Sequence, residues 1–234
     1  MANFLVIAAS SAIGQATVRM LEADGHRVFK TARTDEKISP DIFIDASDFN
    51  AVDDVFKKAI NHFGVIDGVV NFAGSLLLKP AHLTTQENYE DVIKCSLTTA
   101  FATVRSAGKH MKGGSVVLLS SAVHAIGLAN HEAIAAAKAG VVGLALSAAA
   151  TYAGANLRFN VVCPGLTETP LTEHITKNEA ALAYSLAMHP LKRIGHPDDI
   201  ARAVTFLLNP ENSWITGQVL SVDGGLSSLK TKTS

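Results

Sequence analysis

The sequence alternates short apolar runs with helical patterns along its whole length. The apolar runs have the length of strands and lie at residues 4–7, 28–29, 42–44, 68–71, 115–119, 157–162 and 218–222. Since these runs are not interrupted by regularly alternating polar residues, both faces of each strand must be covered, as in a parallel sheet. Helical stretches separate them, at about residues 13–23, 52–60, 85–111, 131–153, 171–187 and 197–208. The pattern predicts an α/β protein, a doubly wound parallel sheet with helices on both faces.

No repeat, low-complexity segment or linker interrupts this alternation in the 234 residues. We therefore expect a single domain over residues 1–234, within the usual size of one large α/β domain. In such a fold, ligands bind at the carboxyl ends of the strands, close to the point where the strand order reverses.

Composition excludes several classes of protein. Lys and Arg number 20 against 21 Asp and Glu, so no basic excess favours nucleic acid as a partner. Two cysteines cannot form a disulfide framework, and the nine histidines show no metal-ligand spacing, so we expect no metal. The N-terminal MANFLVIAAS has no basic region before its apolar run, unlike a signal peptide. The apolar run 133–150 is rich in Ala and Gly and contains Lys138, which indicates a buried helix and not a membrane span. We expect a cytoplasmic protein.

The turn after the first strand, residues 7–14, reads IAASSAIG. A turn at this place directs backbone N–H groups and a helix N-terminus toward a pyrophosphate. Because the usual GxGxxG is absent, the turn alone does not identify a nucleotide site.

Further motifs follow in a fixed order along the chain. They are Asn71-Phe72-Ala73-Gly74, Ser120-Ser121, Lys138, the segment from Asn160 to Thr169, the segment from Pro190 to Gly195, Ile215-Thr216-Gly217-Gln218, and Val222-Asp223-Gly224-Gly225. In this order they resemble the short-chain dehydrogenase/reductase family over about residues 3–226. The resemblance implies a Rossmann fold with a seven-stranded parallel sheet, a nicotinamide cofactor, and hydride transfer to or from the carbon of a small-molecule carbonyl or alcohol.

The resemblance also implies which residues bind the cofactor. Asp45 matches the adenine-contacting aspartate and Ala46 its backbone donor. The remaining positions follow the ends of the other strands and are Ser10, Ser11, Ile13, Gly14, Asn71, Ala73, Gly74, Lys138, Pro164, Gly165, Leu166, Thr167 and Thr169. Among these, Lys138 would bond the nicotinamide ribose, and Leu166, Thr167 and Thr169 would hold the carboxamide and pyrophosphate.

The phosphate turn departs from the family pattern TGxxxGxG. Aligned on Gly14, the three glycines fall on Ala8, Ala12 and Gly14. A Cβ at such a position costs little where φ is negative, and about 1 kcal/mol or more where φ is positive. We expect cofactor binding to be retained but weakened; the alternative is a loop that no longer binds phosphate.

The catalytic set departs further. The family pattern is Asn, Ser and Tyr-x-x-x-Lys; Lys138 places the tyrosine position on Ile134, the serine on Ser121 and the asparagine on Ser96. Carbonyl reduction needs a hydride on carbon and a proton on oxygen, and a tyrosine phenol beside a lysine supplies that proton. Isoleucine has no exchangeable proton, and loss of general acid–base catalysis removes a factor of about 10²–10⁴. Ser121 and Lys138 could still hold a substrate oxygen.

Three residues could substitute for the tyrosine. His131 lies one helical turn before Ile134, His124 follows Ser121 by three residues, and Tyr184 lies in the stretch 171–190 that forms the substrate lid in the family. Each could equally be a surface residue. Tyr152 is too far along the helix to take part.

Cofactor preference is read at the end of the second strand. The position that is acidic in NAD-preferring relatives falls on Ala32, and Arg33 follows it. An arginine offers a planar fork to a 2′-phosphate, which Lys30 and Ser10 could support. We therefore expect NADP and consider NAD less favoured; the alternative is a solvated surface arginine.

Three functions remain open from the sequence. The first is an NADP-dependent oxidoreductase with altered or impaired proton transfer. The second is a non-catalytic dinucleotide-binding protein with a regulatory or structural role, favoured by Ile134, Ser96 and the alanines of the turn. The third is a Rossmann domain without nucleotide, against which Arg33 argues.

Charged residues make up only 18% of the chain, and two helical stretches are notably poor in them. Lys138 is the only charge between residues 133 and 150, and residues 95–104 carry none. A helix that is apolar on more than one side is buried on more than one side. The resemblance implies that the helices near 85–111 and 131–153 pair with a second copy, so we expect a homodimer or homotetramer.

Overall fold

The computed structural model describes residues 1–34 and 39–230. Its strands form a seven-stranded sheet in the order β3-β2-β1-β4-β5-β6-β7, and every neighbouring pair is parallel. The strands are β1 (Asn3–Ile7), β2 (Arg27–Ala32), β3 (Ile42–Phe43), β4 (Gly68–Asn71), β5 (Gly114–Leu119), β6 (Leu157–Pro164) and β7 (Val219–Val222). The order reverses between β1 and β4, where Ile7 pairs with Asn71. The expected doubly wound Rossmann sheet is confirmed.

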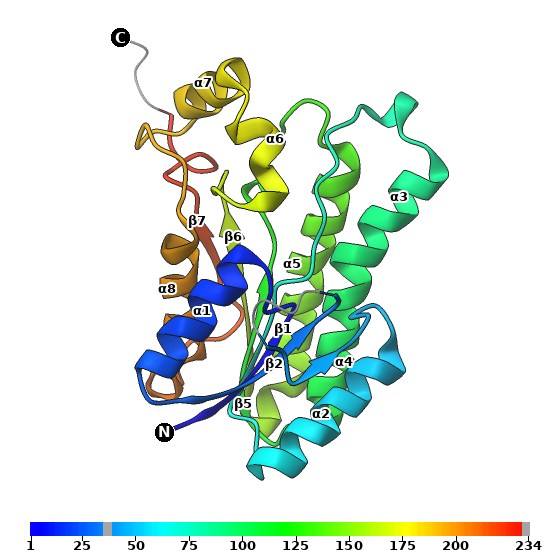
Figure 1. Cartoon of the computed structure of the whole chain (residues 1–234), viewed down its shortest axis with the longest axis vertical. Coiled ribbons are helices and arrows are strands. Elements are labelled where there is room, and N and C mark those ends of the chain that lie inside the picture. The colour runs from blue at the N-terminus through cyan, green and yellow to red at the C-terminus, as the bar shows by residue number, and fades with distance from the viewer. Residues whose placement is uncertain (35–38, 231–234) are drawn as a thin grey trace.

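Helices cover both faces of this sheet (Figure 1). The α-helices are α1 (Ala12–Ala23), α2 (Phe49–Phe63), α3 (Gln86–Ile93), α4 (Thr99–His110), α5 (Glu132–Tyr152), α6 (Glu173–Thr176), α7 (Glu179–Met188) and α8 (Pro197–Leu208). Along β1, Leu5 and Ile7 belong to the core beneath α2, α4 and α5, whereas Phe4 and Val6 belong to the core beneath α1 and α8. Both sides of the strand are therefore apolar, as its sequence predicts.

Short polar side chains cap the helices that begin near the carboxyl ends of the strands, where ligands are expected to bind. Ser11 caps α1 by accepting the N–H of Gly14 at 3.0 Å. Asp48 caps α2 by accepting the N–H groups of Asn50 and Ala51, at 2.8 and 3.3 Å. Each bond satisfies a donor that the first helical turn leaves free.

The stretch expected as one helix over 85–111 is divided. A π turn, η2 (Lys94–Thr98), separates α3 from α4. The hydroxyl of Thr99 donates toward the carbonyl oxygens of Cys95 and Ser96, at 3.0 and 3.1 Å, within this turn. A π turn accommodates one residue more than the α-helix and commonly marks functional positions, and periodicity alone does not reveal it.

The stretch expected as one helix over 171–187 is also divided. It begins with the 3-10 turn η5 (Pro170–Thr172), continues as α6, and restarts as α7 after Asn178. The side chain of Asn178 accepts the N–H of Ala181 at 2.9 Å, which makes it an N-cap. Asparagine favours this role over a place inside a helix. Figure 1 shows α6 and α7 beyond the carboxyl ends of the strands.

Helix α5 has the composition of a membrane span, yet it packs within the fold. The segment Glu132–Ala155 is long and apolar enough to cross a bilayer by length and composition alone. In the structure α5 contacts β5, β6 and α4. Core helices meet the same criteria as spans, and 44% of the apolar window of α5 is buried within the fold, so packing accounts for part of its composition.

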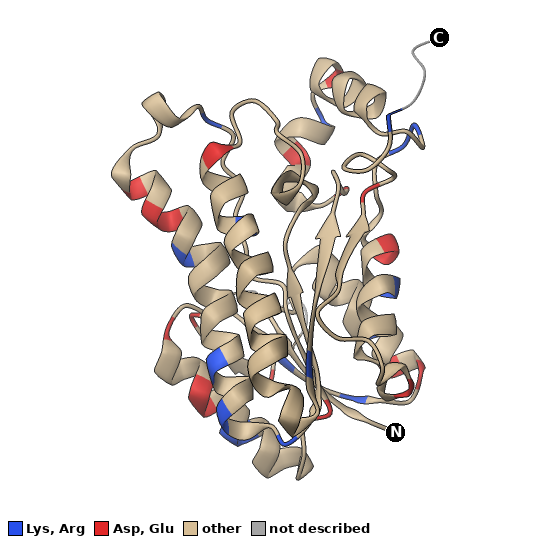
Figure 2. Ribbon diagram, turned by 180° about the vertical axis from the view of Figure 1, so that it is seen from behind, with Lys and Arg blue, Asp and Glu red and all other residues tan. Residues whose placement is uncertain are grey.

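The face of α5 that turns away from the sheet carries little charge, as the ribbon seen from behind shows, whereas α4 carries exposed basic residues in its second half (Figure 2). Phe101 on α4 and Leu146 on α5 remain exposed there. This apolar surface is what a pairing with a second copy would cover, and the expected homo-oligomer stays a prediction.

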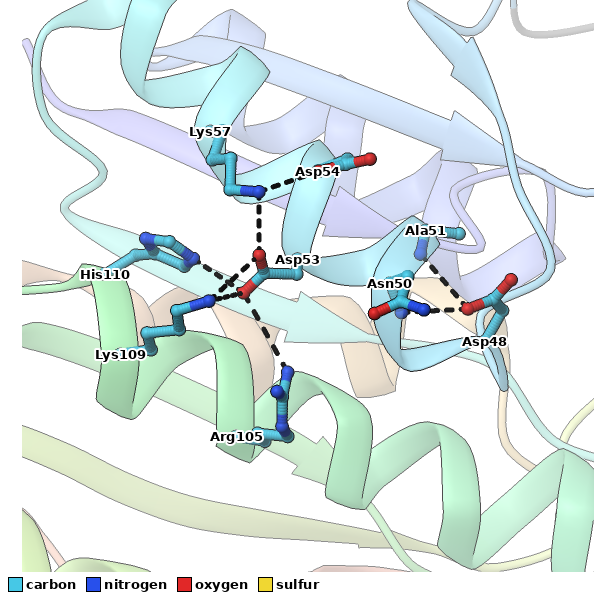
Figure 3. A network of polar contacts seen from close by, with 9 residues as sticks. All are labelled: Asp48, Asn50, Ala51, Asp53, Asp54, Lys57, Arg105, Lys109 and His110. Atoms are coloured by element: carbon cyan, nitrogen blue, oxygen red, sulfur yellow. Dashed lines mark hydrogen bonds and ion pairs between the residues drawn. The ribbon is translucent and has the colours of Figure 1, made fainter.

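One buried carboxylate joins α2 to α4 (Figure 3). The side chain of Asp53 is 8% exposed, and cationic side chains surround it. Nitrogen atoms of Lys57, Lys109 and His110 lie 2.9, 3.0 and 2.8 Å from its oxygens, and Arg105 lies at 3.9 Å. Hydrogen bonds from Lys57, His110 and Lys109 hold the pKa of Asp53 well below its usual range. The cluster fixes the distance between α2 and α4, which support the end of the sheet where ligands are expected to bind.

Candidate active site

A cavity of about 1070 Å³ lies at the carboxyl ends of the strands. Its walls come from the β1–α1 turn, the ends of β2, β4, β5 and β6, α5, and the segment 170–189. Its volume is at the upper end of cavities that hold one ligand. It lies beside the point where the strand order reverses, as the sequence predicted.

The β1–α1 turn forms one wall. Ser10, Ser11 and Ile13 line the cavity, whereas Gly14 does not. A Cβ on Gly14 would lie 2.8 Å from both the carbonyl oxygen of Ala9 and Oγ of Ser11. Gly14 therefore permits close packing of the turn, and its expected contact with the cofactor stays a prediction.

The two alanines at glycine positions differ in backbone geometry. Ala8 has φ +56°, in the left-handed region, and its N–H donates to Oγ1 of Thr31 at 3.3 Å. Left-handed geometry costs an L-residue about 1–2 kcal/mol. Ala12 is the first residue of α1 and is under no such strain. The first alanine thus carries the conformational cost and the second does not.

Arg33 follows β2 at the rim of the cavity and is exposed, whereas Ala32 before it is buried. Across this end of the cavity, Asp45 and Ala46 line the wall. Asp45 accepts hydrogen bonds from Ser47 and lies 3.5 Å from Nζ of Lys94. The bonds from Ser47, with a smaller effect of Lys94, lower the pKa of Asp45. Lys94 also lines the cavity, which sequence reasoning missed because its place depends on the π turn.

The loop after β4 passes over Lys138. Ala73 and Gly74 line the cavity, but Asn71 does not. The side chain of Asn71 accepts the N–H of Ala73 at 2.8 Å and donates to Oγ1 of Thr103 at 3.0 Å. In the structure its side chain shapes the loop, and its expected role in binding the cofactor stays a prediction. A Cβ on Gly74 would lie 3.4 Å from Nζ of Lys138.

Lys138 is buried at the junction of α5 and β5. It is 7% exposed, and its Nζ donates to the carbonyl oxygen of Leu119 at 3.0 Å. Oγ of Ser120 donates to the carbonyl oxygen of Lys138 at 2.9 Å and ties the helix to the strand end. Burial, which disfavours the ammonium ion, lowers the pKa of Lys138 to about 8. The amine is therefore poised to titrate in the physiological range.

Ser121 and Ile134 line the same cavity as Lys138. Ile134 is 3% exposed and packs in a small apolar cluster with Val92, Ala133 and Ala137. Ser96, in the π turn, is also buried but does not line the cavity. Its hydroxyl has no hydrogen-bond partner among the described residues. The structure therefore brings together the serine and lysine positions but not Ser96.

The three possible substitutes for a tyrosine lie in different places. His131 and Tyr184 line the cavity, and Tyr184 is 68% exposed. The Nδ1 of His131 lies 2.7 Å from the carbonyl oxygen of Ala129. His124 does not line the cavity, because its Nδ1 binds the carbonyl oxygen of Ser121 at 2.8 Å within its own 3-10 turn. Its expected role as a substitute acid stays a prediction.

The segment after β6 forms the far wall. Pro164, Gly165, Leu166, Thr167 and Thr169 all line the cavity. Two hydrogen bonds from outside the motif hold this segment. Oγ1 of Thr172 donates to the carbonyl oxygen of Thr167 at 2.5 Å, and the N–H of Gly195 donates to the carbonyl oxygen of Leu166 at 2.8 Å. Thr172 was not found from the sequence, because only the fold brings its hydroxyl back to this segment.

Within the described ranges 1–34 and 39–230, no group of three or more His, Cys, Asp and Glu side chains is placed to hold a metal ion. The parallel sheet, whose strand order reverses beside the cavity, and the helix N-terminus at that cavity define a Rossmann-type protein.

Comparison with known proteins assigns the chain to a narrower class. The sequence model of a family described as enoyl-(acyl carrier protein) reductase matches residues 7–227. The 3-oxoacyl-[acyl-carrier-protein] reductase FabG of Thermotoga maritima is 33% identical over 241 residues, covering 95% of this chain and 96% of the relative. The cis-4-hydroxycyclohexanecarboxylate dehydrogenase of Sinomonas cyclohexanicum is 32% identical over 241 residues, covering 96% of each.

Among solved structures, ElxO with NADP bound superposes with a TM-score of 0.91 at 27% identity, covering 97% of this chain and 99% of that one. The chain belongs to the short-chain dehydrogenase/reductase family of oxidoreductases. The family expected from the motifs is confirmed.

Proposed function

We propose that this protein is an NADP(H)-dependent oxidoreductase that transfers a hydride between the nicotinamide and the carbon of a carbonyl or alcohol, with proton transfer altered because Ile134 stands at the tyrosine position. The observation that carries the proposal is the shared cavity. Ser121 and Lys138 line the same cavity as Arg33 and the N-terminus of α1. The structure of ElxO with NADP bound supports the choice of cofactor.

The residues present fit NADP. Arg33, exposed at the rim, offers its fork to a 2′-phosphate, and Ala32 beside it presents no carboxylate to repel that group. The N-terminus of α1 suits a pyrophosphate. Gly74 leaves room above Nζ of Lys138, where a ribose hydroxyl would accept a hydrogen bond. Leu166 and Thr167 would hold the carboxamide.

The bound dinucleotide would supply or accept the hydride; the chain must position the substrate and move one proton. In reduction, the hydroxyl of Ser121 donates a hydrogen bond to the carbonyl oxygen, and Lys138 stabilises the developing negative charge. Ile134 supplies no proton. His131 lines the cavity, and with Nδ1 directed at the carbonyl oxygen of Ala129, its Nε2 is the nitrogen left to exchange a proton with substrate. We assign this exchange to His131.

A non-catalytic dinucleotide-binding role is the second candidate. It is favoured by the burial of Ile134 in an apolar cluster and by the strain at Ala8. The two candidates differ in turnover and not in binding.

The test titrates NADPH and NADH by fluorescence with wild type, Arg33→Ala and Arg202→Ala, the last being an exposed arginine on α8 outside this cavity. Loss of a charge-assisted hydrogen bond of about 1.5–3 kcal/mol predicts that only Arg33→Ala weakens NADPH, by about 10–100-fold, with NADH little changed. Carbonyl reduction is then assayed over a ketone and aldehyde panel with wild type and His131→Ala.

Turnover by wild type that falls at least tenfold in His131→Ala supports the oxidoreductase and its assigned acid. Tight NADPH binding without turnover favours the non-catalytic candidate. Binding of neither nucleotide contradicts both candidates.

A further inference from the structure

The two ends of the cavity differ in charge. The end formed by the β2 and β3 termini, α3 and the π turn carries four charged lining residues: Arg33, Asp45, Lys94 and, one turn before Lys94 on α3, Asp91. This is the end that the proposed function assigns to the adenosine part of the nucleotide.

The other end lies beyond Ser121 and Lys138. Its walls come from the loop after β4, the loop before α5, α5 itself and the segment 170–188, and they include Leu76, Leu78, Leu128, Ile134, Ile175 and Met188. Among the described residues that line this end, none is Asp, Glu or Arg, and the single Lys is Lys138 at the junction. Its polar groups are hydroxyls and imidazoles.

Lys138 is not free to pair with an anion deep in this end. Its Nζ already donates to Leu119, and the proposed function commits it to the ribose and the reacting oxygen. Apart from Lys138, no lysine or arginine among the described lining residues of this end could pair with a carboxylate or phosphate on the substrate body, so such an anion would lose its hydration without a permanently charged partner. The chemistry of these walls therefore selects against an anionic substrate body.

Apolar side chains are exposed to solvent at the mouth of this end of the cavity. Leu171 is 52% exposed, Tyr184 is 68% exposed, and Leu78 is 37% exposed, and all three line the cavity. They come from opposite sides, the loop after β4 and the segment 170–188. A hydrocarbon body lying between them would remove this surface from water, which is favourable.

We propose that the substrate is an uncharged carbonyl or alcohol compound whose body next to the reacting carbon is hydrocarbon, and that the free carboxylate of such a compound is rejected. The proposal rests on the proposed function for the placement of the reacting carbon. It separates this chain from its Sinomonas relative, whose name states a carboxylate substrate.

The experiment uses two matched pairs of ketones that differ only in charge: ethyl 4-oxocyclohexanecarboxylate against 4-oxocyclohexanecarboxylate, and methyl 3-oxooctanoate against 3-oxooctanoate. Affinities are measured by calorimetry with the full chain, with and without saturating NADP⁺, so that the result does not depend on turnover. We expect each ester to bind at least tenfold more tightly than its acid.

Two variants locate the effect. Ile175→Lys places an ammonium at the apolar end and is expected to reduce the ester-to-acid preference at least tenfold. Val65→Lys is the matched control, because Val65 is exposed before β4, at the opposite edge of the sheet. It is expected to leave the preference unchanged.

The proposal is overturned if either acid binds as tightly as its ester, if neither ester binds, or if Ile175→Lys and Val65→Lys behave alike. Failure of the proposed function looks different: the esters bind, but no nucleotide binds or no turnover follows. The measurements made without NADP⁺ then still decide the preference for uncharged compounds.

Discussion

Ile134 lies one helical turn before Lys138 on the same side of α5, and both buried side chains line the cavity beside Ser121. A residue four positions before the lysine faces the same space because i and i+4 are neighbours on a helix. The place from which a phenol would reach the substrate is thus occupied by a hydrocarbon side chain.

Replacing Ile134 with tyrosine is therefore expected to raise turnover of NADPH-dependent carbonyl reduction. A general acid contributes about 10²–10⁴-fold, so kcat should increase by at least tenfold over wild type even if His131 already delivers some protons. Ile134→Phe is the matched control, since it adds the ring without the hydroxyl. An equal gain in both variants would show that ring packing and not proton transfer is responsible.

Glycine at position 8 is expected to stabilise the protein. The positive φ of Ala8 costs about 1–2 kcal/mol, whereas the extra backbone entropy of glycine costs about 0.5–1 kcal/mol, so relief of strain prevails. Ala8→Gly should raise the free energy of unfolding by about 0.5–1 kcal/mol, measured by urea titration. Ala12→Gly should have the opposite sign, because position 12 is helical. Two changes of the same sign would contradict the explanation.

Lys138 is expected to destabilise the protein in the absence of ligand. Burial lowers its pKa from 10.5 to about 8, so the folded state binds fewer protons than the unfolded state between these values. Stability then rises with pH in this window, and the penalty is fully present below about pH 8. Lys138→Met should gain about 1–3 kcal/mol at pH 7 and lose that advantage by about pH 10.5. Lys177→Met, at an exposed lysine, should show no such trend; a gain from Lys138→Met that is independent of pH would contradict the cause.

Asp53 is expected to make stability sensitive to acid. Its pKa is depressed in the folded state, so its contribution is present above the usual aspartate pKa of about 4 and is lost as pH falls toward the folded value. Losing one partner of a buried pair costs about 3–5 kcal/mol, and since most of these cations are half-exposed, Asp53→Asn should cost about 1–3 kcal/mol at pH 7.

The control for this cluster is the neighbouring carboxylate. Asp54 is exposed and pairs with Lys57 alone, so Asp54→Asn should cost less than about 0.5 kcal/mol. The cost of Asp53→Asn should shrink when urea titrations are repeated below pH 4. If the stability cost of Asp53→Asn is the same below pH 4 as at pH 7, the shape of the side chain and not its charge accounts for the cost.

The sequence predicted the sheet well because most of the buried parallel strands are apolar along their length. It placed Lys138, Ser121 and Arg33 on one cavity because these residues follow strand ends or face them. It could not show how Asn71 and Gly14 shape their loops, since their side-chain or packing partners become neighbours only in the fold. Two further features depend on local hydrogen bonds that hydrophobic periodicity does not predict. The ring of His124 binds the carbonyl oxygen of Ser121, and the side chain of Asn178 caps a new helix.

The π turn around Ser96 has a consequence for redesign of the site. The backbone there holds one residue more than an α-helix, and the hydroxyl of Ser96 is buried without a hydrogen-bond partner among the described residues. Asparagine at position 96 and tyrosine at position 134 would therefore complete the family's catalytic set by changing two side chains, with no change in the length of the main chain.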